Sequence, residues 1–200
     1  LRDRFPEVAL QVDANGSYGS LGPVEGSRRL RPLDGYRLLM IEQPLGDDDL
    51  LGHAELARHL ATPLCLDESI SSLDVAETAL AVGACRIINV KAGRIGGYLA
   101  AVRLHDRCAA RGVALWCGGM LETGVGRAAN LALATLPSFS LPGDLSGADR
   151  FWTRDIVTSP ARLDPDGTIA VPSGPGLGVE LVSDLGAWTR EVTRWVAPGG

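Results

Sequence analysis

The chain has 200 residues, of which 46% are hydrophobic and 22% charged, and its formal net charge is −5. This composition predicts a globular protein with a substantial core and excludes a disordered chain. The mildly acidic balance offers no basic stripe for nucleic acid, and no apolar run reaches the roughly 18 residues of a membrane span. Because no charged-then-apolar signal stands at the start, we expect a cytoplasmic protein with neither nucleic-acid nor membrane partners.

The cysteines and histidines lack the spacing of a metal site or a disulfide framework. The cysteines form no C-x-x-C pair and fall mostly in apolar segments, so we expect buried, reduced thiols at Cys65, Cys85, Cys108 and Cys117. The histidines lie apart from one another in helix-like stretches, and we expect surface positions for His53, His59 and His105.

Short apolar runs alternate with helical stretches along the chain. The expected strands lie within residues 8–15, 37–44, 63–69, 85–93 and 113–119. The expected helices lie within residues 47–61, 71–84, 96–112 and 124–136, whereas residues 19–27, which contain Gly and Pro, are predicted to form a surface loop. Parallel βαβ units repeated in this way predict either a doubly wound sheet or a (β/α) barrel.

An ionisable residue stands at the end of four successive expected strands: Asp13, Glu42, Asp67 and Lys91. Glu42 and Asp67 are 25 residues apart, and Asp67 and Lys91 are 24 apart, close to one βα unit each. Side chains alternate along a strand, so these four share a polar face, and the outward face carries Leu10, Val12, Leu39, Ile41, Leu64, Leu66, Ile88 and Val90. Polar groups converging at the carboxyl ends of strands are typical of a barrel mouth, which favours the (β/α) barrel.

Three carboxylates in one mouth repel one another, so we expect a cation between Asp13, Glu42 and Asp67. Oxygen ligands without histidine or cysteine favour Mg²⁺, with Mn²⁺ as the alternative. Lys91 beside that cation could act as a base toward a proton next to a metal-bound carboxylate, or as a cation facing the resulting anion. The alternative is that all four residues form ordinary salt bridges around a structural barrel rim.

Five motifs carry a family resemblance. "DAN" at Asp13, "IEQP" at Glu42, "LDES" at Asp67 and "KAGRIGG" at Lys91 resemble the metal-ligand and catalytic motifs of the enolase superfamily, in its muconate-lactonizing subgroup. The run that begins "GGMLETGVGRAANLALATLP", with "LPGDLSG" and the tail "VPSGPGLGVEL", resembles the o-succinylbenzoate synthase and N-acylamino acid racemase branch. The resemblance implies an α/β protein with a TIM-type barrel, incomplete here at about six βα units and without its amino-terminal capping domain.

The resemblance also implies roles for single residues. Asp13, Glu42 and Asp67 would bind Mg²⁺, and Lys91 would be one of two lysines flanking the reacting carbon of a small carboxylate substrate. The synthase reaction is a dehydration through an enediolate that serves menaquinone biosynthesis, whereas in the racemase both lysines exchange a proton. Contacts to the metal site or the substrate are implied for Asn15, Gly118, Gly119 and Met120.

In the family, the second lysine lies in a K-x-K motif on the strand that precedes the one bearing Asp13, and the chain contains no such motif. We therefore expect residues 1–150 to be a partial barrel that carries the metal site, and residues 151–200 to be a tail that packs on the missing capping domain. The full-length form is expected to be a homo-oligomer. The alternative from another class is a non-catalytic fragment that lacks the K-x-K lysine.

Overall fold

The computed structural model describes residues 1–191, and the chain divides into two compact units. The first unit consists of Leu1–Gly119 and Leu133–Asp144. The second consists of Met120–Ala132 and the chain from Leu145 onward. The second unit thus takes in residues 120–132 and 145–150 in addition to the expected tail.

The first unit is built on a parallel sheet of five short strands. They lie side by side in chain order: β1 (Val12–Asp13), β2 (Ile41–Glu42), β3 (Leu64–Leu66), β4 (Ile87–Val90) and β5 (Ala114–Cys117). Next to β5, Phe139 forms a single parallel bridge with Leu115. A doubly wound sheet reverses its strand order at a switch point, so this unbroken order is that of a barrel-type sheet.

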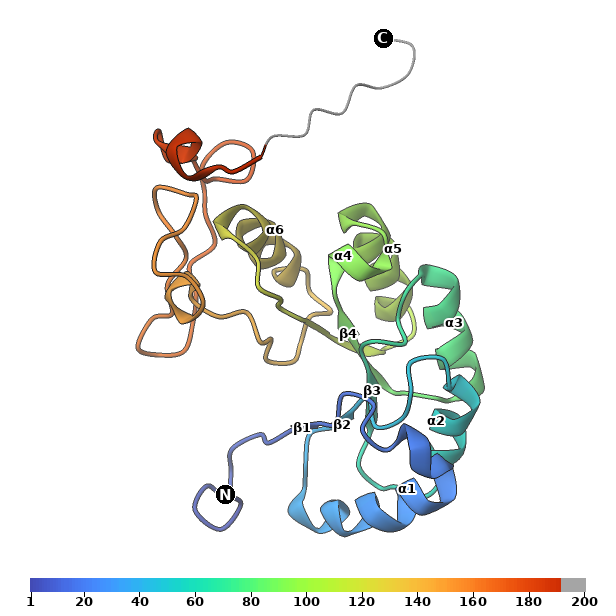
Figure 1. Ribbon diagram of the computed structural model, residues 1–200. Helices are drawn as coiled ribbons and strands as arrows, with labels where there is room; N and C mark the ends of the chain where they lie inside the picture. The colour runs from blue at the N-terminus through green and yellow to red at the C-terminus, as the bar shows by residue number, and fades with distance from the viewer. Residues whose placement is uncertain (192–200) are drawn as a thin grey trace, which may run out of the picture. The chain divides into compact units, whose positions relative to one another are not determined.

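Helices follow the strands and pack on one face of the sheet. They are α1 (Gly22–Leu30), α2 (Leu50–Ala57), α3 (Leu73–Val82) and α5 (Tyr98–Ala109), with the single turn α4 (Ala92–Ile95) before α5. Figure 1 shows α1, α2, α3 and α5 in succession along the outer side of the strands. Two of them begin with a side-chain cap, because Asp49 accepts a hydrogen bond from the Gly52 N–H and Ser72 accepts one from the Val75 N–H.

The core of the first unit reflects the predicted alternation of side chains. One cluster, on the helix side, contains Leu30, Ile41, Leu45, Leu56, Leu60 and Leu64. The other, which we term the inner cluster, contains Met40, Cys65, Ile87 and Trp116. The expectation for Leu39 was wrong, because it packs on the inner cluster: β2 begins only at Ile41, so strand parity does not extend back to it. All four cysteines are buried and none of them forms a disulfide, as predicted.

The prediction of a surface loop at residues 19–27 was wrong, since helix α1 begins at Gly22. Pro23 stands in its first turn, where a missing N–H costs nothing. Glu25 pairs with Arg28 at 2.7 Å and with Arg29 at 2.9 Å, which are the contacts that three- and four-residue spacings allow on a helix. These pairs, more than apolar periodicity, mark the segment as helical.

Two of the three histidines are buried, contrary to the prediction that all lie on the surface. His53 is fully buried, and its Nε2 accepts a hydrogen bond from the Leu45 N–H at 3.1 Å. His105 is 7% exposed, and its Nε2 accepts one from the Ser138 N–H at 3.2 Å. Each ring thus satisfies a loop amide, which accounts for its burial on an otherwise ordinary helix. His59 is exposed.

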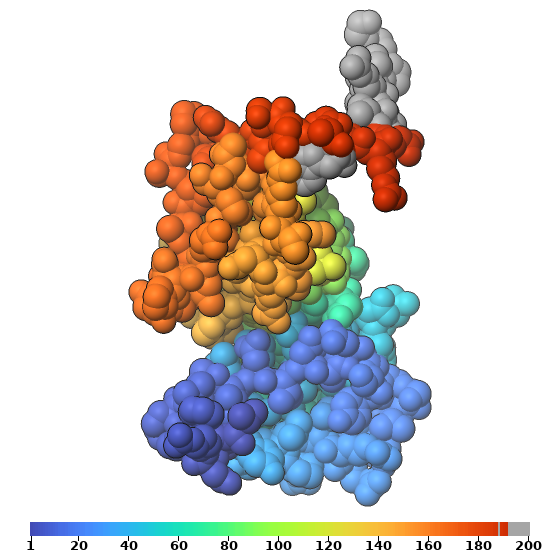
Figure 2. All heavy atoms as spheres, turned by 60° about the vertical axis from the view of Figure 1, so that its left-hand side comes forward, coloured from blue at the N-terminus to red at the C-terminus, as the bar shows by residue number. Residues whose placement is uncertain are grey.

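The second unit contains α6 (Gly124–Ala134) over most of its length and a largely irregular chain, whose surface appears in orange and red in Figure 2. Arg127 of α6 is fully buried and donates hydrogen bonds to the carbonyl oxygens of Ser146 at 2.6 Å and Glu122 at 3.1 Å. The buried carboxylate of Asp155 accepts one from the Gly124 N–H at 2.8 Å. These bonds, rather than regular strands, connect the segments of this unit.

Among residues 1–191, no helix has both the length and the apolar character needed to cross a membrane.

Candidate active site

The four ionisable residues predicted at strand ends occupy one edge of the first unit's sheet. Asp13 and Glu42 are the last residues of β1 and β2 and stand opposite each other in the parallel register. Asp67 and Lys91 are the first residues after β3 and β4. The carboxyl ends of the strands therefore gather three carboxylates and one amine, in agreement with the reasoning from spacing.

Glu42 is 2% exposed, and its Oε1 accepts a hydrogen bond from Asn89 Nδ2 at 2.7 Å. Burial raises the pKa of Glu42 to about 8, and repulsion from Asp13 and Asp67 acts in the same direction. The hydrogen bond from Asn89 and the positive charge of Lys91 oppose this rise in pKa only in part. Without a cation nearby, the charged form of this carboxyl group is disfavoured at neutral pH.

Asp67 is 1% exposed, and both of its carboxylate oxygens face cations. Lys91 Nζ lies 2.7 Å from Oδ2, and Arg94 Nη1 contacts Oδ1. The Lys91 side chain is 14% exposed, so the pair is largely shielded from water. Arg94, on the single turn α4, is a site residue that sequence reasoning missed, although it stands within the quoted motif "KAGRIGG".

Asp13 is exposed and bonded to Asn15. Asn15 donates its backbone N–H to Oδ1 of Asp13 and its side-chain amide to Oδ2, each at 2.9 Å. The same Nδ2 lies 3.1 Å from Glu68 Oε1, so the amide bridges Asp13 and Glu68. Strand parity favours Asp67 over Glu68 as the group that faces the site, yet the bridge through Asn15 ties Glu68 to the site as well.

Gln43 is a second residue that the sequence did not single out. It is 1% exposed, and its Oε1 accepts hydrogen bonds from the backbone N–H groups of Asp67 at 3.0 Å and Ser69 at 3.3 Å. Its Nε2 donates to Ser69 Oγ at 2.7 Å. The Gln43 side chain therefore fixes the chain just after β3 and, with it, the backbone of Asp67. A glutamine beside a strand-end carboxylate is the sequence signal that could have identified it.

The predicted substrate-contacting segment divides between the two units. Gly118 and Gly119 follow β5 in the first unit, where the Gly119 N–H donates to Asp144 Oδ1. Met120 belongs to the second unit and is 55% exposed, and its N–H donates to the Glu122 carboxylate. Asp144 is thus a further carboxylate of the first unit that sequence reasoning did not name.

The donor set at this edge fits a hard divalent cation in its chemistry. Asp13, Glu42 and Asp67 offer only carboxylate oxygen, and the first and last of them raise the pKa of Glu42 by repulsion that a cation would relieve. In the described part of the chain, no group of three His, Cys, Asp or Glu side chains is already arranged to hold a metal ion. A cation at Asp67 would take over the charge that Lys91 and Arg94 now supply.

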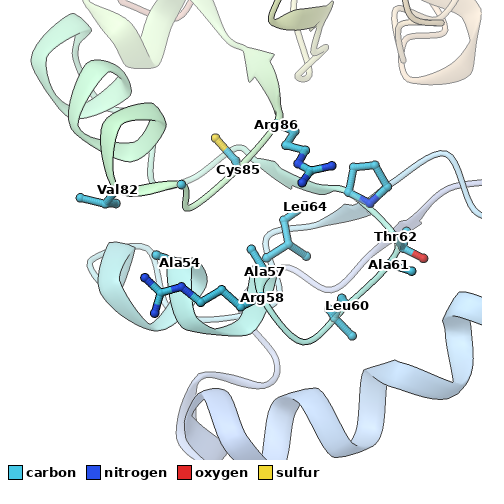
Figure 3. Close-up of a pocket in the computed structure, with 12 residues that line it drawn as sticks. Ala54, Ala57, Arg58, Leu60, Ala61, Thr62, Leu64, Val82, Cys85 and Arg86 are labelled. Atoms are coloured by element: carbon cyan, nitrogen blue, oxygen red, sulfur yellow. The ribbon is translucent and has the colours of Figure 1, made fainter.

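A cavity of about 250 Å³ in the first unit lies away from this edge. Its lining includes Pro63, which precedes β3, and Arg86, which precedes β4, so it opens at the amino ends of the strands. Figure 3 shows the side chains of Arg58 and Arg86 on different sides of the cavity, without convergence on one point. Active sites of barrels lie at the opposite ends of the strands, and this cavity is not the candidate active site.

Comparison with known proteins places these motifs in a family. Residues 1–185 match the model of the enolase C-terminal domain-like family. An N-succinylamino acid racemase from Amycolatopsis is 56% identical over 92% of this chain and 49% of its own length. An o-succinylbenzoate synthase from Bacillus subtilis strain 168 is 50% identical over 92% of this chain and 48% of its own length.

Solved structures agree with the sequence relatives. The crystal structure of an enolase superfamily member from Listeria innocua has a TM-score of 0.85 and 45% identity, covering 93% of this chain and 48% of that one. The chain spans about half the length of the curated relatives it matches. The family resemblance seen in the motifs is confirmed, and so is the α/β, barrel-type fold class. The chain belongs to the enolase C-terminal domain-like family.

Proposed function

We propose that the protein containing this chain is a magnesium-dependent o-succinylbenzoate synthase. The observation that carries the proposal is the gathering of Glu42, Asp67 and Lys91 at one strand edge, with Asp13 opposite Glu42 in register. Relatives that share half or more of their aligned residues with this chain bear the names of this synthase and of a racemase. We therefore propose that the whole protein catalyses one of these two reactions.

Asp13, Glu42 and Asp67 would hold Mg²⁺, or Mn²⁺ in its place. When bound, the cation supplies positive charge that stabilises the negative charge developing on a substrate carboxylate. Until then, Lys91 and Arg94 balance the charge of Asp67.

Lys91 is the residue that we assign to proton chemistry. Its Nζ is mostly shielded from solvent and lies beside Asp67, so it can face an anionic intermediate as a cation or exchange a proton with the reacting carbon. Asn15 and the backbone of Gly118, Gly119 and Met120 are proposed to contact the substrate or the metal site. The substrate is a small carboxylate, and the reaction eliminates water to give an aromatic precursor of menaquinone.

The second candidate is an N-succinylamino acid racemase that uses the same residues. The relative named for that activity is 56% identical to this chain, compared with 50% for the synthase from Bacillus subtilis. Both reactions need a carbanion next to a carboxylate, so Asp13, Glu42, Asp67 and Lys91 serve either. The third candidate is a non-catalytic barrel fragment that lacks the K-x-K lysine and retains a metal site or nothing. We propose that the whole protein is a homo-oligomer and that residues 151–200, of which 192–200 lie outside the described residues, pack on a capping domain.

The test is an assay of the whole protein on both substrates, before and after removal of divalent metal. The synthase proposal expects magnesium-dependent dehydration to exceed racemisation in kcat/KM. Lys91→Ala should abolish racemisation without weakening Mg²⁺ binding, because the amine is no metal ligand and competes with the cation for Asp67. Dehydration that persists in Lys91→Ala, or without divalent metal, would contradict the assignment, and absence of both activities would contradict both enzymatic candidates. A gene with no K-x-K segment upstream of this chain would favour the non-catalytic fragment.

A further inference from the structure

Asn89 is a buried polar residue that none of the assigned roles uses. It lies on β4, two residues before Lys91, and is 1% exposed. Its Nδ2 donates a hydrogen bond of 2.7 Å to Oε1 of Glu42 on β2, 47 residues away in the chain. The two side chains therefore meet on the face of the sheet that carries the candidate site.

This hydrogen bond leaves the two oxygens of Glu42 in different states. Oε1 is engaged by Asn89, whereas Oε2 has no hydrogen-bond partner in residues 1–191 and is not sealed off from solvent. Asp67 is held differently, since its oxygens contact the cations Lys91 and Arg94. A neutral amide orients the carboxyl group without placing a positive charge beside it, so one oxygen of Glu42 stays open to a cation.

The oxygen of the Asn89 side-chain amide makes an unfavourable contribution to the free energy of folding. Its Oδ1 is buried without a hydrogen-bond partner in residues 1–191, which lowers the free energy of unfolding. A role for the Nδ2 end of the side chain would account for a residue that carries this cost. The space around it exists because Gly118 has no side chain. A Cβ at Gly118 would overlap Asn89 Oδ1 and would lie 2.7 Å from Lys91 Cε. A leucine at position 89 would fill a similar volume without the unpaired oxygen.

We propose that Asn89 is a positioning residue that, in the space left by Gly118, holds Glu42 with one carboxylate oxygen free for a divalent cation. The inference rests on the metal site of the proposed function. It assigns Gly118 a steric role beside Asn89 and Lys91, in addition to any contact that its backbone makes with substrate.

The first measurement is calorimetric titration of Mg²⁺ alone into the 200-residue chain and two variants. Asn89→Leu removes the donor at similar volume and should weaken Mg²⁺ binding by about 10- to 100-fold, as loss of an outer-shell partner does. The control is Thr62→Val, which removes the 2.7 Å bond from Thr62 Oγ1 to Asp34 at the other end of β3. The control should keep Mg²⁺ affinity within about twofold while losing stability.

The second measurement needs neither metal nor activity. In the NMR spectrum of the metal-free chain, one side-chain amide proton of Asn89 should be shifted downfield by its hydrogen bond to the Glu42 carboxyl group, and Glu42→Leu, which removes that acceptor, should reverse the shift. An Asn89 signal that does not change in Glu42→Leu would overturn the inference even where Asn89→Leu does not fold. Unchanged Mg²⁺ affinity in a folded Asn89→Leu would overturn it as well. Failure of the unaltered chain to bind Mg²⁺ would instead overturn the metal site, and with it this role.

Discussion

The carboxyl group of Glu42 is buried next to two other carboxylates, so folding raises its pKa from 4.5 to about 8. Between these values the folded chain binds the proton that the unfolded chain has released. The free energy of unfolding of the metal-free chain should therefore fall as pH rises from about 4.5 to about 8, the reverse of what a salt-bridged carboxylate gives. Denaturant unfolding at several pH values measures this slope.

Glu42→Gln is the matched control for that slope, because it retains the shape of the side chain and cannot ionise. Its unfolding free energy should depend less on pH over the same interval. Equal pH dependence in the two proteins would mean that Glu42 is not the group responsible.

Asp67 carries a prediction about metal and activity. Asp67→Asn removes the anion between Lys91 and Arg94 and replaces a negatively charged oxygen ligand by a neutral one. In the whole protein we expect metal-dependent turnover to fall by about a thousandfold or more, with the fold intact by circular dichroism. Asp74→Asn, at an exposed first-turn position of α3, is the control and should retain full turnover. Substantial activity in Asp67→Asn would remove Asp67 from the ligand set.

Single residues of the site were predictable where strand parity applies. Asp13, Glu42, Asp67 and Lys91 stand at strand ends, and an alternating pattern with a spacing of one βα unit identifies such positions. Arg94, Gln43 and Asn89 escaped because their roles depend on partners 24 to 47 residues away in the chain. His53 and His105 escaped because each accepts a hydrogen bond from a loop amide, 8 and 33 residues away in the chain, that no local pattern reveals.

At the scale of elements, all five strands lie within the segments predicted from apolar runs, and their parallel order follows from the helices between them. Helix α1 was missed because glycine and proline in its sequence favour a loop, whereas Glu25, Arg28 and Arg29 stabilise it after it forms. The helices proved shorter than their apolar patterns, as α2 ends at Ala57 and α5 at Ala109. Periodicity locates an element, but caps and loop contacts set its ends.

Helix α6 carries a prediction for the second unit. Arg127→Leu deletes a buried guanidinium, which removes the side-chain donor to the Ser146 carbonyl and one of the two side-chain donors to the Glu122 carbonyl, the other being Trp152 Nε1. We expect a loss of about 2–4 kcal/mol in the free energy of unfolding, measured with denaturant. Arg150→Leu is the matched control, because Arg150 is exposed and also lies over the Phe151 ring, and it should cost less than about 0.5 kcal/mol. Equal losses in the two variants would contradict a structural role for the buried arginine.

At the scale of the whole molecule, the chain spans about half the length of its curated relatives, and its sheet has five parallel strands in residues 1–191. The barrel type was predictable because ionisable residues recur at the ends of successive strands, about one βα unit apart, and the strand order of the sheet agrees with it. The division into two units was not predictable from the sequence. Its boundary between Gly119 and Met120 falls inside the predicted substrate-contacting segment, which does not have the composition of a linker. Tertiary contacts, rather than a change in sequence character, set that boundary.

The whole chain offers a direct test of the metal site through its stability. A cation that binds only the folded form raises the free energy of unfolding by about 2.7 kcal/mol at a hundredfold excess over Kd. Thermal unfolding of the 200-residue chain should therefore shift to higher temperature as Mg²⁺ is added. Asp67→Asn should abolish most of the shift, and an equal shift in that variant would place Mg²⁺ elsewhere.

The pairing of Asp67 with Lys91 and Arg94 makes metal uptake at this position an ion exchange rather than a simple addition. Lys91 and Arg94 act as counterions of Asp67 that are covalently part of the protein. Diluting the solution therefore does not weaken their pairing with Asp67. If Asp67 held Mg²⁺, its carboxylate would no longer hold the Lys91 amine and the Arg94 guanidinium in their present positions. Metal binding would thus free the Lys91 amine to turn toward a substrate. Filling of the cation site and release of the proton-exchanging residue would then occur in one process.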